Sequence, residues 1–159
     1  MAAALPAVAP ASEGPGAPAR PARQVIFRVG AERYALPLES LRQVVVPRPP
    51  FARVPRAPGA VRGAMNLRGR VVAVVDLAPL VGLPDQPLAG GQGQVLILDR
   101  DRRGLGLLVG AVLGVEPLVA ESARPGLLCG VAQASAGAVS LLDPAVLVAQ
   151  AEALFGAGG

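Results

Sequence analysis

Short apolar runs alternate with glycine, proline and charged residues along most of the chain. This pattern is typical of β-strands joined by tight turns. The clearest expected strands are residues 24–29, 33–37, 42–46, 60–67, 70–76, 94–98, 104–109 and 138–142. Weaker strand signals fall at residues 111–115 and 127–132. Because about ten short strands with frequent turns suit a barrel or a double barrel, we expect a mainly all-β fold.

Helix signals are few. Asp143 precedes Pro144, which suits an N-cap followed by proline at the first helical position. We therefore expect a C-terminal helix that stops at Gly156. Residues 38–41 and 77–82 are expected to form short helical turns. A doubly wound α/β fold would need long helices between its strands, and the pattern shows none.

The ends of the chain differ in composition from its middle. Residues 1–23 are rich in Ala and Pro, and such a segment does not form a packed core. We expect a disordered tail at 1–23, a folded domain at 24–155 and a flexible C-terminus at 156–159.

The longest strongly apolar run, residues 105–115, is shorter than the roughly 20 residues of a membrane span. Since the N-terminus also lacks the basic region of a secretory signal, we expect a cytoplasmic protein without membrane insertion.

The composition argues against an enzyme. The chain has no His, so the usual acid/base group near neutral pH and the commonest metal ligand are both missing. Its one cysteine, Cys129, can form neither an internal disulfide nor a cysteine-based zinc site. The serines have only carboxylates as possible bases. We therefore expect a binding module with no catalytic residue, no metal site and no cofactor.

The basic residues are unevenly placed. All 15 are Arg, the net charge is +4, and one stretch between Glu39 and Asp76 contains several arginines and no acid. The arginines of this stretch are Arg42, Arg48, Arg53, Arg56, Arg62, Arg68 and Arg70. They suit an acidic partner or a nucleic acid, or they form an ordinary solvated face. The absence of Lys and of stacking aromatic residues argues against nucleic acid.

A second charged group lies at residues 99–103, between two expected strands. Asp99 and Asp101 are close enough in sequence for a metal or an acid pair to be considered. The alternation of these acids with arginines instead favours a cluster of salt bridges at a hairpin tip.

The apolar runs 60–67 and 70–76 enclose Arg68 and Gly69, which predicts a hairpin whose turn uses a positive φ at Gly69. A rigid turn that presents a guanidinium is a good recognition element, although Arg68 could equally be a solvated turn residue. Asp76 ends an apolar strand, where a carboxylate needs a partner. We expect Asp76 to cap the following helical turn rather than to contact a partner protein.

Residues 61–77 read V-R-G-A-M-N-L-R-G-R-V-V-A-V-V-D-L. This segment resembles the signature v-x-G-x-x-N-L-R-G-x-v-x-P-V-x-D-L of the CheW family, the coupling proteins of bacterial chemotaxis arrays. Residues 27–38 are similar to the family's opening hairpin, Val44 with residues 54–58 to its strand and proline loop, and residues 107–112 to a later strand. The resemblance covers residues 24–154.

Three departures accompany this resemblance. Ala73 stands where the family usually has Pro, and Gly110 stands where it usually has Asp. Residues 117–142 look shorter than the corresponding family segment, so contacts made there need not carry over.

The resemblance implies two small SH3-like five-stranded β-barrels with short helices and a C-terminal helix. It also implies a scaffold between the cytoplasmic tip of a methyl-accepting chemoreceptor and the regulatory domain of a CheA-type histidine kinase. The family's receptor contacts would fall on Leu41, Gly63 and Arg68. We add Val44, Asn66 and Gly69 as candidate partner-binding residues and take Asp76 as structural. The alternatives are an adaptor of a gliding, twitching or other non-flagellar pathway and, more remotely, an Arg-rich nucleic-acid-binding barrel or a hydrolase.

Overall fold

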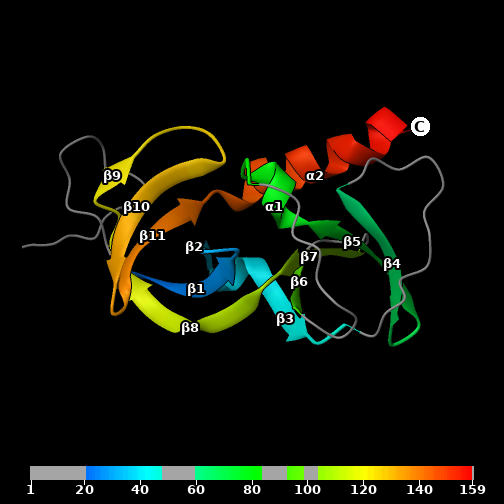
Figure 1. The fold of residues 1–159 in the computed structure, drawn as a ribbon, viewed down its shortest axis with the longest axis horizontal. Coiled ribbons are helices and arrows are strands. Elements are labelled where there is room, and N and C mark those ends of the chain that lie inside the picture. Colours follow the sequence, from blue (N-terminus) through cyan, green and yellow to red (C-terminus); the bar gives the residue numbers. More distant parts are fainter. Residues whose placement is uncertain (1–20, 48–59, 84–92, 99–103, 159) are drawn as a thin grey trace, which may run out of the picture.

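A computed structural model describes residues 21–47, 60–83, 93–98 and 104–158. Within these ranges the chain is mostly β and forms two sheets, as expected (Figure 1). The first sheet has the order β8-β1-β2-β11-β10-β9 and the second has the order β3-β6-β7-β5-β4. The chain therefore starts in the first sheet, builds the second with its middle part and then returns to complete the first.

The strands of the first sheet are β1 (Ala22–Val29), β2 (Glu32–Pro37), β8 (Ala111–Leu118), β9 (Ser122–Ala123), β10 (Leu128–Ala134) and β11 (Gly137–Leu142). Those of the second sheet are β3 (Leu41–Val45), β4 (Val61–Leu67), β5 (Arg70–Asp76), β6 (Gln94–Leu98) and β7 (Gly104–Val109). The helical elements are η2 (Leu38–Ser40), α1 (Leu77–Leu80) and α2 (Pro144–Gly158). In Figure 1, α1 and α2 lie together on one side of the two sheets.

Some boundaries differ from the expected ones. The first sheet has a sixth strand, because the two-residue β9 pairs with β10. β1 begins two residues before the expected domain start at Gln24, since Ala22 and Arg23 pair with Leu118 and Pro117 of β8. At the other end, the backbone of α2 continues past Gly156 to residue 158. The residues expected to be a flexible C-terminus are therefore helical up to that point.

Three apolar clusters hold the fold together. One contains Ile26, Ala35 and Val139 and belongs to the first sheet, and another contains Val72 and Val95 and belongs to the second. The third draws on both sheets and both helices, and its fully buried members include Phe27, Leu36, Val75, Leu77, Leu96, Leu107 and Leu147. Because this third cluster is shared, the two sheets pack as one body rather than as two independent units.

The strands that face two clusters are apolar on both faces. In β5, Val72 and Val74 enter the cluster of the second sheet, whereas Val75 enters the shared cluster. Successive side chains of a strand point to opposite faces, so this alternation follows from strand geometry. It explains why β5 reads as a continuous apolar run rather than an alternating one.

The C-terminal helix starts as predicted. Oδ1 of Asp143 accepts hydrogen bonds from the backbone N–H groups of Ala145 at 2.9 Å and Val146 at 3.4 Å. The N-cap therefore satisfies two of the donors that a helix start leaves unpaired. Leu147 and Ala151 of α2 are fully buried in the shared cluster. No helix among the described residues is long and apolar enough to cross a membrane.

Two of the three departures from the family pattern are single residues, Ala73 and Gly110, and both lie within the described residues. Ala73 lies in β5 between β4 and β7, and nothing in the structure explains why this chain has Ala there. The N–H of Gly110 donates to the carbonyl oxygen of Arg28 at 2.8 Å, and a Cβ at residue 110 would lie 2.9 Å from that same oxygen. Gly110 is therefore needed for the close approach of β1 to the β7–β8 connection.

Candidate functional site

The β4–β5 hairpin closes through a two-residue turn at Arg68 and Gly69. Their φ angles are 53° and 83°, the two positive values typical of a type I′ turn. The positive φ predicted at Gly69 is thus confirmed. Arg68 is the one non-glycine residue in the described ranges with a positive φ, a conformation that costs about 1–2 kcal/mol for a residue with a Cβ. The turn therefore holds an exposed arginine in a strained backbone conformation.

Asn66 fixes this turn from inside the hairpin. Its Oδ1 accepts a hydrogen bond from the N–H of Gly69 at 2.9 Å. Leu67 and Arg70, which flank the turn, are paired in the strand register. Asn66 and Gly69 were both predicted as partner-binding residues, and the structure gives each a part in shaping the turn. Together they fix the backbone from which the side chain of Arg68 leaves the turn.

Gly63 lies at an irregularity in β4. The register shifts between Val61 and Gly63, so that Val61 pairs with Val75, Gly63 pairs with Val74 and Arg62 lies at the shift. This is the arrangement of a β-bulge. Gly63 is buried and has a φ of 143°, which favours glycine. The structure therefore places Gly63 in the frame of the hairpin and not on its exposed surface.

Asp76 caps α1, as predicted, and also pairs with a cation. Its side chain is 4% exposed, its Oδ1 accepts from the N–H of Ala78 at 3.1 Å, and its Oδ2 lies 2.7 Å from Nη2 of Arg62. The sequence analysis missed the Arg62 contact. The one signal for it was a carboxylate at the end of an apolar strand, which requires a partner. Arg62, which lies at the bulge of β4, is this partner.

Leu41 and Val44 lie elsewhere, on β3. Leu41 is half-buried against the shared cluster, and Val44 is 38% exposed. β3 is at one end of the strand order of the second sheet and β4 is at the other. The predicted partner-binding residues therefore separate into a group of four on the β4–β5 hairpin and a pair on β3.

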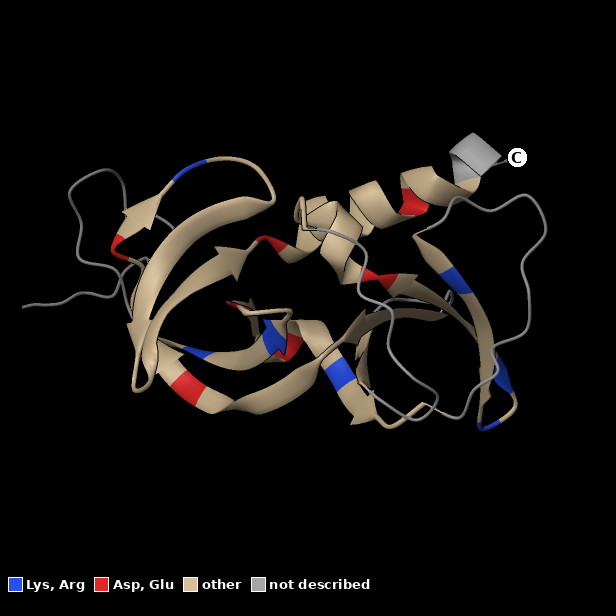
Figure 2. Ribbon diagram, viewed as in Figure 1, with Lys and Arg blue, Asp and Glu red and all other residues tan. Residues whose placement is uncertain are grey.

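The arginines of the described residues differ in exposure and in whether an acid pairs with them. Figure 2 shows arginines along β4 and at the β4–β5 turn, with a further one on β3. Arg62 forms an ion pair with Asp76, whereas Arg68 and Arg70 are exposed. Three arginines of the predicted stretch, Arg48, Arg53 and Arg56, lie outside the described residues, as does the charged cluster at residues 99–103.

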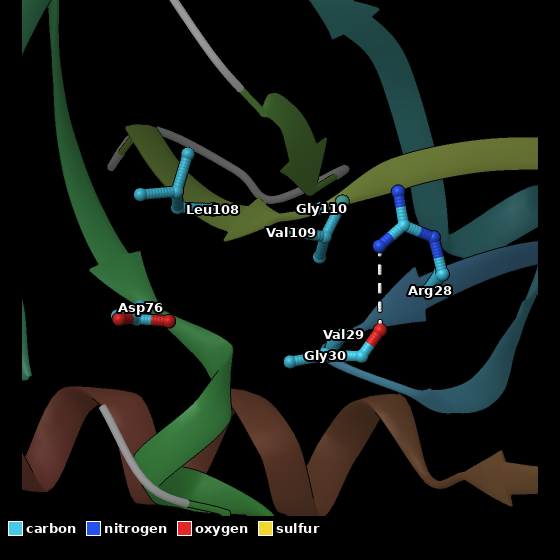
Figure 3. A pocket seen from close by; sticks show the side chains of 7 residues that line it. All are labelled: Arg28, Val29, Gly30, Asp76, Leu108, Val109 and Gly110. Carbon is cyan, nitrogen blue, oxygen red and sulfur yellow. Dashed lines mark hydrogen bonds between the residues drawn. The ribbon is translucent and has the colours of Figure 1, made fainter. Parts of the chain in front are cut away.

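A small pocket lies between the two sheets, close to the carboxylate of Asp76 (Figure 3). The β1 end and the following turn contribute Arg28, Val29 and Gly30, and the second sheet and its exit contribute Asp76, Leu108, Val109 and Gly110. Nη1 of Arg28 donates to the carbonyl oxygen of Gly30 at 3.3 Å. Because both oxygens of Asp76 already accept hydrogen bonds, this carboxylate serves the fold and is poorly placed to act as a base.

The remaining reactive side chain is Cys129, which is half-buried. Burial raises the pKa of its thiol, and the charge of Asp143 raises it further. The thiol is therefore protonated near neutral pH and is a poor nucleophile. Within the described ranges, no three His, Cys, Asp or Glu residues are grouped closely enough to hold a metal ion.

Comparison with known proteins points to one family. The model of the CheW-like domain family matches residues 23–158. The chain is 30% identical over 102 residues to the "Probable chemotaxis protein CheW" of Rhizobium etli, covering 64% of each protein. It is 29% identical over 102 residues to the "Chemotaxis protein CheW" of Klebsiella aerogenes, covering 64% of this chain and 60% of the relative. The match to "Protein PilI" of Pseudomonas aeruginosa is 29% identical over 90 residues, covering 57% of this chain and 49% of the relative.

The chain thus spans less than two thirds of the length of each of these curated relatives. Among solved structures, the scaffolding protein TtCheW from Thermoanaerobacter tengcongensis has the same fold, with a TM-score of 0.67 and 23% identity. The superposition covers 77% of this chain and 89% of TtCheW. The two-sheet architecture, with its SH3-like barrels, is therefore that of the CheW fold.

Proposed function

The chain belongs to the CheW-like domain family, and we propose that it is a non-enzymatic cytoplasmic scaffold that couples chemoreceptors to a CheA-type histidine kinase. Its partners are then the cytoplasmic tip of a methyl-accepting chemoreceptor and the regulatory domain of the kinase. The match of the family model over residues 23–158 carries this proposal, because it covers almost all of the described chain.

The arrangement of the candidate residues suits a protein that binds two partners at once. The β4–β5 hairpin presents Arg68 and β3 presents Val44, and β3 and β4 are not neighbours in the strand order. The two sheets share one apolar cluster and so behave as a single body. A scaffold of this kind can hold one partner at the hairpin while another partner occupies a different face.

Arg68 is the strongest candidate for a contact. It is exposed, and it makes no side-chain hydrogen bond or ion pair within the described residues. Its positive φ is unfavourable for a residue with a Cβ, and strain of this kind is concentrated at functional positions. Arginines in such positions are frequent among residues that dominate binding energy.

The direct experiment measures binding of the full chain to a receptor-tip fragment and to the kinase regulatory domain. We expect micromolar or tighter binding to both. Arg68→Glu should weaken one of the two contacts by about 2 kcal/mol or more. Arg23→Glu is the matched control, because Arg23 is also an exposed strand arginine but lies on the first sheet. Absence of binding to both partners at micromolar concentration would contradict the proposal.

The similarity to Protein PilI supports a second candidate, since that relative is not named as a chemotaxis protein. In this alternative the chain is the adaptor of a gliding, twitching or other non-flagellar pathway. The scaffold role is the same and the partners differ. Identification of the histidine kinase that co-purifies with the chain separates the two candidates.

Nucleic-acid binding remains the distant alternative. It predicts that binding to DNA or RNA falls steeply as salt is raised. Of the arginines that motivated it, Arg62 forms an ion pair with Asp76 in the structure, so its charge is already used. A filter-binding measurement at two salt concentrations tests this alternative directly.

A further inference from the structure

The outward face of β8 is apolar. Burial alternates along this strand, and its exposed positions are Leu113, Val115 and Pro117. Leu113 is 52% exposed, Val115 is 42% exposed, and Val119, directly after the strand, is also 42% exposed. When one face of an antiparallel sheet packs on a core, its other face is usually polar. We refer to these four residues, Leu113, Val115, Pro117 and Val119, as the β8 strip.

The β8 strip continues a face of the first sheet that is buried elsewhere. Val115 is the register partner of Val25, which is 3% exposed and pairs in turn with Leu36 of the shared cluster. Cross-strand partners have their side chains on the same face. Because β8 is the last strand in the order of the first sheet, the apolar face that is covered over β1 and β2 lies open at β8.

The charged residues near the β8 strip point elsewhere or lie at its border. Glu116 alternates with Val115 and Pro117, so it points to the other face of the strand. Its carboxylate accepts hydrogen bonds from the N–H of Ser135 at 2.9 Å and from the hydroxyl of Ser135 at 2.6 Å. Arg23, the register partner of Pro117, is exposed beside one end of the strip. An uncharged apolar segment therefore suits the strip better than a charged one.

The chain before β1 contains such a segment. Ala22 pairs with Leu118, so the residues that precede β1 leave the first sheet beside the β8 strip. Residues 1–11, which we call the N-terminal arm, have no charged side chain and contain Leu5 and Val8. A proline-rich chain favours the polyproline II helix, which has three residues per turn. Leu5 and Val8 then lie on the same side of the arm.

The N-terminal arm is long enough to return along β8. Residues 14–16 read Gly-Pro-Gly, and Gly-Pro and Pro-Gly pairs mark turns. At about 3.1 Å per residue, residues 17–21 reach about 15 Å and the arm about 34 Å. The β8 strip is about 20 Å long at about 3.3 Å per residue. An arm that reverses at residues 14–16 therefore runs back past β1 and along the strip.

We propose that the N-terminal arm folds back over β8 and covers the β8 strip, with Leu5 and Val8 packed against Leu113 and Val115. An Ala/Pro-rich segment cannot form a core of its own, but here the folded domain supplies the apolar surface. The covalent connection keeps the arm at an effective concentration on the order of millimolar, so weak contacts are sufficient. This inference does not rest on the proposed function, because the occupant of the strip is part of the same chain.

Methyl NMR spectra of the full chain and of a chain lacking residues 2–11 test this contact. The methyl resonances of Leu113 and Val115 should shift when the arm is removed, because their apolar neighbours are replaced by water. Val131 is the matched control, since it is 37% exposed on β10 of the same sheet, and its resonances should not shift. Unchanged resonances of Leu113 and Val115 overturn the proposal.

Two paired variants of the full chain test which side of the arm makes the contact. Leu5→Ser combined with Val8→Ser should reproduce the shifts caused by the deletion. Ala4→Ser combined with Ala7→Ser has the same three-residue spacing on another side of the arm, and it should leave the spectrum of the wild type unchanged. Equal effects of the two pairs, or no effect of either, contradict the proposed packing.

The same spectra distinguish the arm from other occupants of the β8 strip. In the wild type, the resonances of Leu113 and Val115 should not depend on protein concentration. If they move on dilution while sedimentation shows a dimer dissociating, a second copy of the chain covers the strip and the proposal is wrong. If removal of the arm has no effect and the resonances shift only when a receptor-tip fragment or a kinase regulatory domain is added, the strip belongs to that partner and the proposal is likewise overturned.

Discussion

Nη2 of Arg62 lies 2.7 Å from Oδ2 of the buried Asp76, and this ion pair joins the bulge of β4 to the start of α1. The same carboxylate caps α1 through the N–H of Ala78. One side chain therefore connects the base of the β4–β5 hairpin with the helix packed beside the second sheet. The hairpin that presents Arg68 is held at its base by this pair and at its tip by Asn66.

Asp76→Ala should destabilise the protein. The substitution removes the helix cap and leaves the guanidinium of Arg62, which is 26% exposed, without this acceptor. We expect the free energy of unfolding to fall by about 2–4 kcal/mol, as measured by urea denaturation. Asp76→Asn keeps an oxygen that can cap α1 and should lose less. Equal stability of Asp76→Ala and the wild type would show that the pair does not hold the hairpin.

Arg68→Asn should change stability and binding in opposite directions. Asn tolerates a positive φ better than Arg, so the variant should be more stable by about 0.5–1 kcal/mol in thermal or urea unfolding. It removes the guanidinium, so receptor binding should weaken. A variant that is both less stable and unimpaired in binding contradicts the description of Arg68 as a strained contact residue.

Gly110→Ala should destabilise the junction of the two sheets. The new Cβ would lie 2.9 Å from the carbonyl oxygen of Arg28, which already accepts the hydrogen bond from residue 110. Because the neighbour is backbone and cannot rotate away, we expect a loss of about 1–3 kcal/mol in the free energy of unfolding. Differential scanning calorimetry gives the shift in Tm, and an unchanged Tm would show that β1 can move at no cost.

The thiol of Cys129 should react slowly. Burial and then the charge of Asp143 raise its pKa, so less thiolate is present at a given pH than for a free cysteine. Its alkylation rate at pH 8 should be lower in the native chain than in the chain unfolded in urea, and the native rate should keep rising at higher pH. The unfolded chain is the control, since Cys129 is its one cysteine. Equal rates in the two states exclude the raised pKa.

Turns and helix caps could be predicted from the sequence, because they are formed by residues close together in the chain. The turn at Gly69 follows from glycine's access to positive φ, and the start of α2 follows from Asp143 and Pro144. The cap formed by Asp76 was also predictable, because a carboxylate after an apolar strand needs a donor. These features depend on residues a few positions apart.

Features that depend on strand register were not predictable in this way. The pairing of Arg62 with Asp76 requires the bulge before Gly63, and the sequence does not mark where a register shifts. β9 is too short to show a period, and it exists only because β10 lies beside it. The separation of Val44 from the hairpin likewise follows from the strand order of the second sheet.

In the proposed role, this chain holds a receptor and a kinase at the same time, with Arg68 at the receptor contact. The most direct measurement is a pull-down on an immobilised receptor-tip fragment with the kinase regulatory domain in solution, with and without the chain. We predict that the kinase domain is retained only when the chain is present, and that Arg68→Glu abolishes this retention while Arg23→Glu does not. The proposed role is contradicted if the kinase domain is not retained when the chain is present, or if the kinase domain displaces the chain from the immobilised receptor.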